Sequence, residues 1–208
     1  MLTFHYAPGA CSLASHIVLE EIEVPFEPVR LDLMAGDQHR PEFRAVNPLG
    51  KVPALVTGRG TITESPAILS YLADLSPGHG LLPADPHDRA QCASTMSWLA
   101  SSVHIGFARY WRQAIFTPEE SAWQGLKEKA QADIAEALAR MDARLDGLDW
   151  YHGTYSVVDP YVLVMRRWGS RIGLDMGAFP NLVAHGLRVA ARPAAARAIA
   201  REGIRIDG

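Results

Sequence analysis

The chain has 208 residues, a formal net charge of −3 and 21% charged residues, an ordinary composition for a globular protein. Its lysines and arginines are scattered, which argues against a nucleic-acid partner or an anionic membrane surface. The sequence contains no apolar run of the roughly 20 residues that cross a bilayer and no signal-peptide pattern. We therefore expect a cytoplasmic protein that binds neither membranes nor nucleic acid.

The two cysteines, Cys11 and Cys92, show neither CxxC spacing nor the density of a disulfide scaffold. This usage fits a reducing compartment. The eight histidines form no HxxxH motif and no Cys/His cluster, so we expect no metal site.

The first third of the chain alternates short strands with helices. Apolar alternation predicts strands over residues 2–6 and 29–33, and a helix follows the first strand from about Cys11. Residues 55–62 flank a Gly-Arg-Gly turn and predict a hairpin. Ser65 is expected as the N-cap of the next helix, with a proline in the first helical position. The order is strand, helix, strand, a loop with room for a helix, strand, strand, helix.

The remaining chain predicts helices only. Helical periodicity covers residues 88–112 and 119–148. Another helix starts near Val158, where Ser156 and Asp159 resemble a capping box. Two last short helices begin at prolines 180 and 193. The predicted fold class is therefore α/β plus all-α: a βαβαββα domain over residues 1–76, a linker over 77–86 and a helical bundle over 87–208.

Cys11 is the first candidate for chemistry. It should lie in the first turn of a helix, where the dipole and free N–H groups favour an anion and lower a thiol pKa. The alternative is a small buried apolar side chain, as most unpaired cysteines are. The neighbouring hydroxyl of Ser12 is placed to donate to a bound thiolate.

Two further segments suit a peptide-like ligand. A cis bond before Pro53 would turn the backbone of Val52 outward for strand-like pairing, although a plain strand-initiating proline explains the sequence equally well. The helix N-terminus at Ser65 suits a carboxylate, and Glu64 suits an ammonium group. Ordinary helix capping is the alternative.

Two polar aromatic residues remain ambiguous. His104 lies within a predicted helix, where a lone histidine is usually structural. Tyr6 ends the first predicted strand, where a phenol usually packs with one polar tip.

The order of these signals is specific. Residues 6–13 (YAPGACSL), 47–55 (NPLGKVPAL), 63–68 (TESPAI) and 156–161 (SVVDPY) resemble the cytosolic glutathione transferase family, and the first segment is most similar to its bacterial beta class. The resemblance spans nearly the whole chain. It implies a thioredoxin-like N-terminal domain, a helical C-terminal domain, glutathione as co-substrate and a homodimer.

The resemblance also implies residue roles. Cys11 matches the cysteine that faces the glutathione sulfur, and His104 matches the histidine that reaches it from the helical domain. Glu64 and Ser65 match the residues that hold the γ-glutamyl end. The peptide-pairing segment is Lys51, Val52 and cis Pro53. Catalytic roles are thus expected for Cys11, Ser12, His104 and Tyr6.

The second substrate is expected to be a small hydrophobic electrophile, with detoxification as the role. Its predicted pocket walls are Phe107, Tyr110, Trp111 and Trp168. This region departs from the beta class, because Ile105 replaces a basic residue and residues 107–112 are bulkier and more cationic. The main prediction is transfer of the glutathione thiolate to such an electrophile. A thiol-disulfide reductase that uses Cys11 and a non-catalytic binder of glutathione or hydrophobic ligands remain alternatives.

Overall fold

The computed structural model describes residues 1–206, and the last two residues of the predicted helical domain lie outside this range. Its strands form one sheet in the order β2-β1-β3-β4. Their bounds are β1 (Leu2–Tyr6), β2 (Phe26–Arg30), β3 (Ala54–Thr57) and β4 (Gly60–Thr63). β1 runs parallel to β2 and antiparallel to β3, which pairs antiparallel with β4. The predicted parallel pair and terminal hairpin are confirmed.

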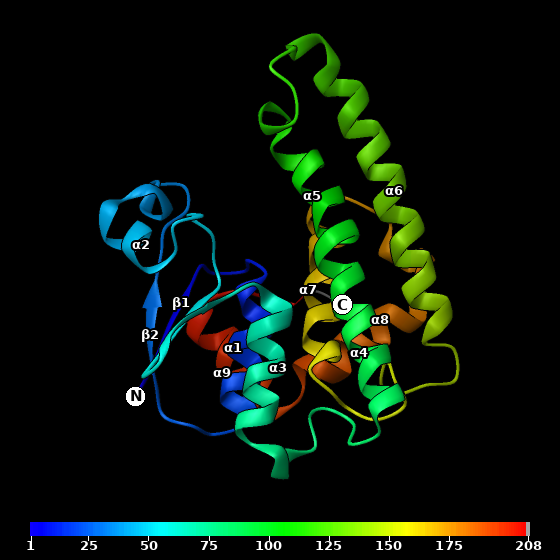
Figure 1. Cartoon of the computed structure of the whole chain (residues 1–208). Coiled ribbons are helices and arrows are strands. Elements are labelled where there is room, and N and C mark those ends of the chain that lie inside the picture. Colours follow the sequence, from blue (N-terminus) through cyan, green and yellow to red (C-terminus); the bar gives the residue numbers. More distant parts are fainter. Residues whose placement is uncertain (207–208) are drawn as a thin grey trace.

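Helices cover both faces of this sheet. α1 (Ser12–Glu21) and α3 (Ser65–Leu75) pack together on one face, and α2 (Pro41–Val46) lies on the other (Figure 1). The strict alternation of β1 explains the arrangement, because Phe4 is fully buried toward α1 whereas His5 packs on Phe43 of α2. The order βαβαββα and the thioredoxin-like fold are therefore confirmed.

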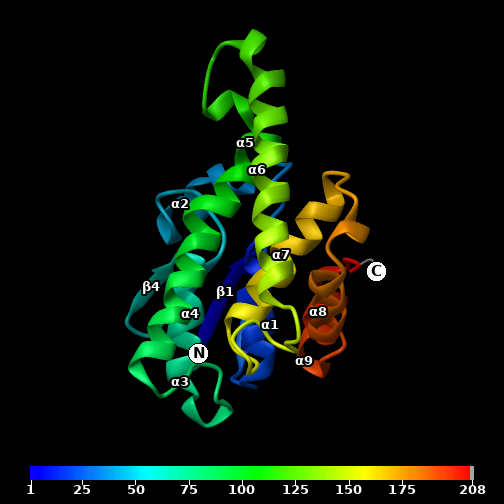
Figure 2. The same ribbon diagram turned by 90° about the vertical axis from the view of Figure 1, so that its right-hand side faces the viewer.

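Helices make up the second part of the chain. They are α4 (Pro86–Trp98), a π-helical turn (Leu99–Val103), α5 (His104–Trp111), α6 (Trp123–Arg144), α7 (Val158–Arg171), α8 (Pro180–Ala190) and α9 (Pro193–Glu202). Short 3₁₀ turns lie at Asp37–His39, Pro77–His79, Gln113–Ile115, Glu120–Ala122 and Met176–Ala178. α5 and α6 project beyond the sheet domain, and α9 returns to pack against α1 (Figures 1 and 2).

Helix α7 is buried along nearly its whole length and begins with the predicted capping box. The Asp159 carboxylate accepts the Ser156 N–H at 2.7 Å, and the Ser156 hydroxyl accepts the Val158 N–H at 3.3 Å. Asp159 also accepts the Tyr151 N–H and pairs with His185, both at 2.8 Å. This buried carboxylate therefore joins the start of α7 to the preceding loop and to α8.

Some predicted boundaries were wrong. Strand β2 lies three residues earlier than expected, because the Asp32 carboxylate accepts the N–H groups of Met34 and Ala35 and turns the chain. The helix predicted over 88–112 begins at Pro86, since Asp85 caps it, and contains the π turn. The helix predicted over 119–148 is shorter and spans Trp123–Arg144. The domain boundaries at 76 and 87 stay a prediction.

Candidate functional site

The loop of residues 7–11 delivers Cys11 to the start of α1. Gly9 turns this loop with φ of 69°, a left-handed conformation that glycine adopts without steric cost. The buried Ser12 hydroxyl donates to the Ala7 carbonyl at 3.2 Å and lies at the same distance from the Ala7 N–H, which donates to it. These bonds hold the loop against the first turn of the helix.

The Cys11 thiol is buried and donates to the Val52 carbonyl at 3.4 Å, beside a cis Val52-Pro53 bond. Burial raises the pKa of this thiol from 9.0 to about 11. The Ser65 hydroxyl and the positive charge of Arg112 act in the opposite direction and do not offset the burial. The pKa is thus raised rather than lowered as expected, because burial outweighs the groups that favour the thiolate.

The N-terminus of α3 lies next to Cys11. Ser65 is the first residue of the helix rather than its N-cap; Glu64 takes the cap position with φ of 70° and makes no side-chain capping bond. The buried Ser65 hydroxyl instead lies near Cys11 and Tyr161 of α7 and lowers the pKa of each, although burial raises both pKa values overall. Ordinary capping therefore does not explain Ser65.

His104 begins α5 and packs edge-on against Trp168, with ring centroids 4.9 Å apart. Burial lowers the pKa of His104 to about 4, and the positive charges of Arg112 and Lys51 lower it as well. The imidazole is therefore neutral at neutral pH, with one nitrogen that donates and one that accepts a hydrogen bond.

Three of the four predicted wall residues form one aromatic cluster beside His104. The ring centroids of Phe107 and Trp111 are 5.4 Å apart, and Trp168 lies 5.3 Å from each. Trp111 remains 42% exposed, whereas Phe107 is fully buried. The cluster therefore presents Trp111 as its accessible surface.

Tyr110, the fourth wall residue, meets this cluster only through Trp111, with ring centroids 6.5 Å apart. Its hydroxyl donates to the Ile172 carbonyl at 3.3 Å, and the Lys127 ammonium lies 4.7 Å from its ring centroid. Helical geometry explains the difference, since residues adjacent in sequence lie about 100° apart around a helix. With Trp111 it lines a shallow cavity of about 340 Å³ near the tip of α5 and α6.

The side chains of two predicted catalytic residues contact other groups instead. Tyr6 stacks on Phe4 with centroids 5.9 Å apart and contacts His16 at 4.9 Å, inside the core that α1 covers. Burial and the negative Glu202 raise its pKa. The Ser12 hydroxyl is occupied by the backbone of Ala7. Both positions argue against the predicted contacts with a glutathione sulfur.

Sequence reasoning missed Arg112 and Tyr161 as members of the site. Arg112 acts electrostatically on both Cys11 and His104. It directly follows Trp111, which lies seven residues after His104 and therefore on the same helix face. That spacing was a readable signal. Tyr161 gave no comparable signal, because its place beside Ser65 depends on how α7 packs against the sheet domain.

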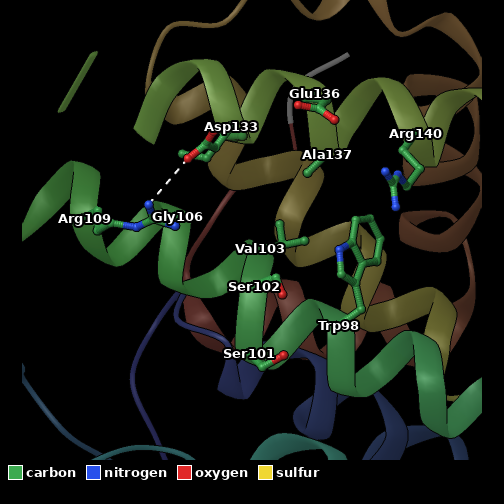
Figure 3. Close-up of a pocket in the computed structure, with 11 residues that line it drawn as sticks. Trp98, Ser101, Ser102, Val103, Gly106, Arg109, Asp133, Glu136, Ala137 and Arg140 are labelled. Atoms are coloured by element: carbon green, nitrogen blue, oxygen red, sulfur yellow. Dashed lines mark hydrogen bonds and ion pairs between the residues drawn. The ribbon is translucent and has the colours of Figure 1, made fainter. Parts of the chain in front are cut away.

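A second cavity, of about 330 Å³, lies between the α4–α5 segment and α6 (Figure 3). Its lining includes charges of both signs: Asp133, Glu136 and Arg140 lie along α6, and Arg109 of α5 faces Asp133. The Arg109 guanidinium pairs with the Asp133 carboxylate at 3.4 Å. The lining contains none of the predicted site residues, so this cavity lies apart from the residues that meet at Cys11.

Within residues 1–206, no helix combines the length and apolar character that a membrane crossing requires. The same residues include no group of three or more histidine, cysteine, aspartate or glutamate side chains placed to share a metal ion.

Comparisons with known proteins point to one family. Residues 1–74 match the family model for the glutathione S-transferase N-terminal domain. Glutathione S-transferase GstA of Escherichia coli O157:H7 is 34% identical over 204 residues, which cover 96% of this chain and 98% of that protein.

Solved structures agree over the full length. A glutathione transferase homologue from Sulfitobacter with bound glutathione superposes with a TM-score of 0.92 at 31% identity and covers 99% of both chains. A bacterial beta class enzyme from Sphingomonas chungbukensis has a TM-score of 0.85 at 38% identity, covering 98% of this chain and 100% of that one. With the thioredoxin-like sheet, the helical domain and the cluster at Cys11, these matches show that the chain belongs to the cytosolic glutathione S-transferase family.

Proposed function

We propose that this protein is a glutathione transferase that joins the glutathione thiolate to small hydrophobic electrophiles. The observation that carries the proposal is the meeting, at one place, of the Cys11 thiol, the Val52 carbonyl and the Ser65 hydroxyl. The Sulfitobacter homologue, which covers 99% of this chain, has bound glutathione, and the full-length relatives are named transferases.

Glutathione fits the groups around Cys11. The backbone of Val52 offers an extended segment to the cysteinyl part of the tripeptide. The exposed Glu64 and the N-terminus of α3 suit the ammonium and carboxylate of the γ-glutamyl end. The exposed Lys51 ammonium suits the other carboxylate. The tripeptide sulfur then lies beside Cys11.

Positive charge near His104 favours a thiolate of glutathione. Arg112 and Lys51 both raise the electrostatic potential at His104, whereas at Cys11 the positive Arg112 is opposed by the negative Glu64. The N-terminus of α1 adds to this potential. Neutral His104 donates one hydrogen bond to the sulfur. Lowering the glutathione thiol pKa by two units requires about 2.7 kcal/mol, and a hydrogen bond to a charged group, worth about 1.5–3 kcal/mol, is of that size.

The reaction forms a carbon–sulfur bond. The thiol proton passes to solvent, the sulfur lone pair attacks the electrophilic carbon, and the leaving group departs with the electron pair of its bond. Trp111 offers an exposed aromatic face for a flat apolar substrate, backed by Phe107 and Trp168.

The high pKa of Cys11 bears on the reductase alternative. A thiol-disulfide reductase needs a thiolate on the protein, and burial keeps the Cys11 thiol protonated at neutral pH. We therefore assign Cys11 a place next to the glutathione sulfur rather than the role of nucleophile. A purely binding role would leave glutathione affinity without turnover.

We also propose that the protein is a cytoplasmic homodimer with a role in detoxification. Two buried, unpaired cysteines fit a reducing compartment. The face around the cavity in Figure 3 carries Arg140 and Glu136, and a two-fold-related copy offers the opposite charge to each. Light scattering of the wild type and of Arg140→Glu tests this, since a dimer through that face would dissociate in the variant.

Steady-state conjugation tests the proposal. Wild type, His104→Ala and Cys11→Ala are assayed with glutathione and an activated aryl chloride, with glutathione affinity measured by calorimetry. We expect turnover in the wild type, a loss in kcat for His104→Ala, and retained turnover for Cys11→Ala. Glutathione binding without turnover of any electrophile would instead support a binding protein.

A further inference from the structure

The end of the C-terminal helix reaches the loop that carries Cys11. Glu202, the last residue of α9, is buried with its side chain fully enclosed. One carboxylate oxygen accepts the Gly9 N–H at 2.7 Å, and the other lies 2.8 Å from Nδ1 of His16 on α1. A single side chain from near the end of the chain therefore bonds the loop and the helix that follows it.

Gly9 is held from its other side by α7. The indole N–H of Trp168 donates to the Gly9 carbonyl at 2.9 Å, and the Arg167 guanidinium donates to it at 3.2 Å. Both backbone polar groups of this residue thus bond to side chains of the helical domain. Gly9 also has no space for a side chain, since a Cβ would lie 2.6 Å from Arg167.

Helix α9 is anchored to α1 independently of Glu202. Arg197 donates to the Glu20 carboxylate at 2.8 Å and to the Glu20 carbonyl at 2.9 Å, and Arg201 donates to the same carboxylate at 2.5 Å. These partly exposed pairs hold the helix in place whether or not Glu202 is present. The contact between Glu202 and Gly9 is therefore separable from the docking of α9.

We propose that Glu202 is a positioning residue of the active site, acting through Gly9 to fix the loop that places Cys11. Glu202 forms no hydrogen bond with Cys11 or with the residues proposed to bind glutathione, so its effect on the site is indirect. A buried carboxylate forms a short, strong bond with a backbone N–H, and its loss leaves the N–H without a partner. The loop then moves relative to the Val52 carbonyl that receives the Cys11 thiol.

Cysteine labelling of the free protein tests the positioning directly. Wild type and Glu202→Ala are treated with iodoacetamide, and mass spectrometry follows Cys11 and Cys92 separately. Cys92 is fully buried in the helical domain and reports global opening. Loss of one hydrogen bond to a charged group corresponds to a roughly tenfold or larger change in loop opening. We expect the ratio of Cys11 to Cys92 labelling to rise by that factor.

Two further variants separate positioning from general loosening. Arg197→Ala weakens the docking of α9 but keeps Glu202, so it should lower the urea midpoint without changing the labelling ratio. Glu202→Gln keeps an acceptor for the Gly9 N–H and should restore most of the wild-type ratio. Equal acceleration of both cysteines in Glu202→Ala, or an unchanged ratio, would overturn the proposal.

The kinetic consequence rests on the proposed function. If glutathione binds beside Cys11, Glu202→Ala should raise KM for glutathione several-fold more than KM for the electrophile, with Arg197→Ala unchanged in both. If neither wild type nor Glu202→Ala conjugates an electrophile but the labelling ratio still rises, the result supports the positioning role and contradicts only the transferase. A KM for glutathione unchanged in an active Glu202→Ala would count against positioning.

Discussion

The protonation of Cys11 is the property of the site that most constrains its chemistry. Burial places the thiol pKa at about 11, against 9.0 for an unperturbed thiol. A pKa of 11 leaves a thiolate fraction on the order of 10⁻⁴ at pH 7. The shift of about two units corresponds to roughly 3 kcal/mol of preference for the neutral form.

Alkylation as a function of pH measures this preference. The rate of iodoacetamide reaction at Cys11 should rise about tenfold per pH unit from pH 7 to beyond pH 9, because only the thiolate reacts. At each pH, the alkylation rate of Cys11 is compared with that of Cys92 in the same sample. Circular dichroism defines the pH range in which the fold persists.

The raised pKa of Cys11 also makes the free energy of unfolding depend on pH. Because the folded-state pKa is raised, the folded protein retains the Cys11 proton between pH 9 and 11 while the unfolded chain loses it. The contribution is complete below about pH 9 and is lost as the pH rises toward 11. The difference in unfolding free energy between wild type and Cys11→Ala should therefore shrink over that window. An alkylation plateau near pH 7 would refute the reasoning and revive the reductase.

Three substitutions separate packing from catalysis. Ser12→Ala removes the hydroxyl that holds the Ala7 backbone and should cost about 1–3 kcal/mol of stability in urea unfolding. Its kcat at saturating substrate should stay close to wild type. A hundredfold loss of kcat in a folded variant would show that Ser12 is catalytic. Asp159→Ala abolishes four buried hydrogen bonds and should cost about 3–6 kcal/mol; a melting temperature within a few degrees of wild type would contradict the assigned role. Trp111→Ala should raise KM for an aryl electrophile about tenfold through lost aromatic contact and leave KM for glutathione unchanged, and equal effects on both would disprove its place in the wall.

Local patterns determined most of the fold. The alternation of β1, the proline at the start of α3 and the capping box at Ser156 each correspond to one physical rule, and each predicted its element. β2 was misplaced because its register depends on pairing with β1 and on the Asp32 turn, neither of which periodicity contains.

The site was predictable where it depends on the backbone. The loop before Cys11, the segment at Val52 and the N-terminus of α3 are fixed by short motifs, and the structure brings them together. The orientation of a side chain was not predictable in this way. Ser12 lies next to Cys11 in sequence but bonds to the loop backbone, and Glu202 reaches that loop across 193 positions.

Product analysis of a single reaction shows whether this protein transfers glutathione. Purified protein is incubated with glutathione and an activated aryl chloride, and mass spectrometry follows the thioether and released chloride. The rate of their formation is compared with the uncatalysed rate. We expect catalysed thioether formation that saturates with glutathione, falls at least tenfold in His104→Ala and persists in Cys11→Ala. No catalysis above background in a protein that binds glutathione would contradict it, as would turnover that depends strictly on Cys11.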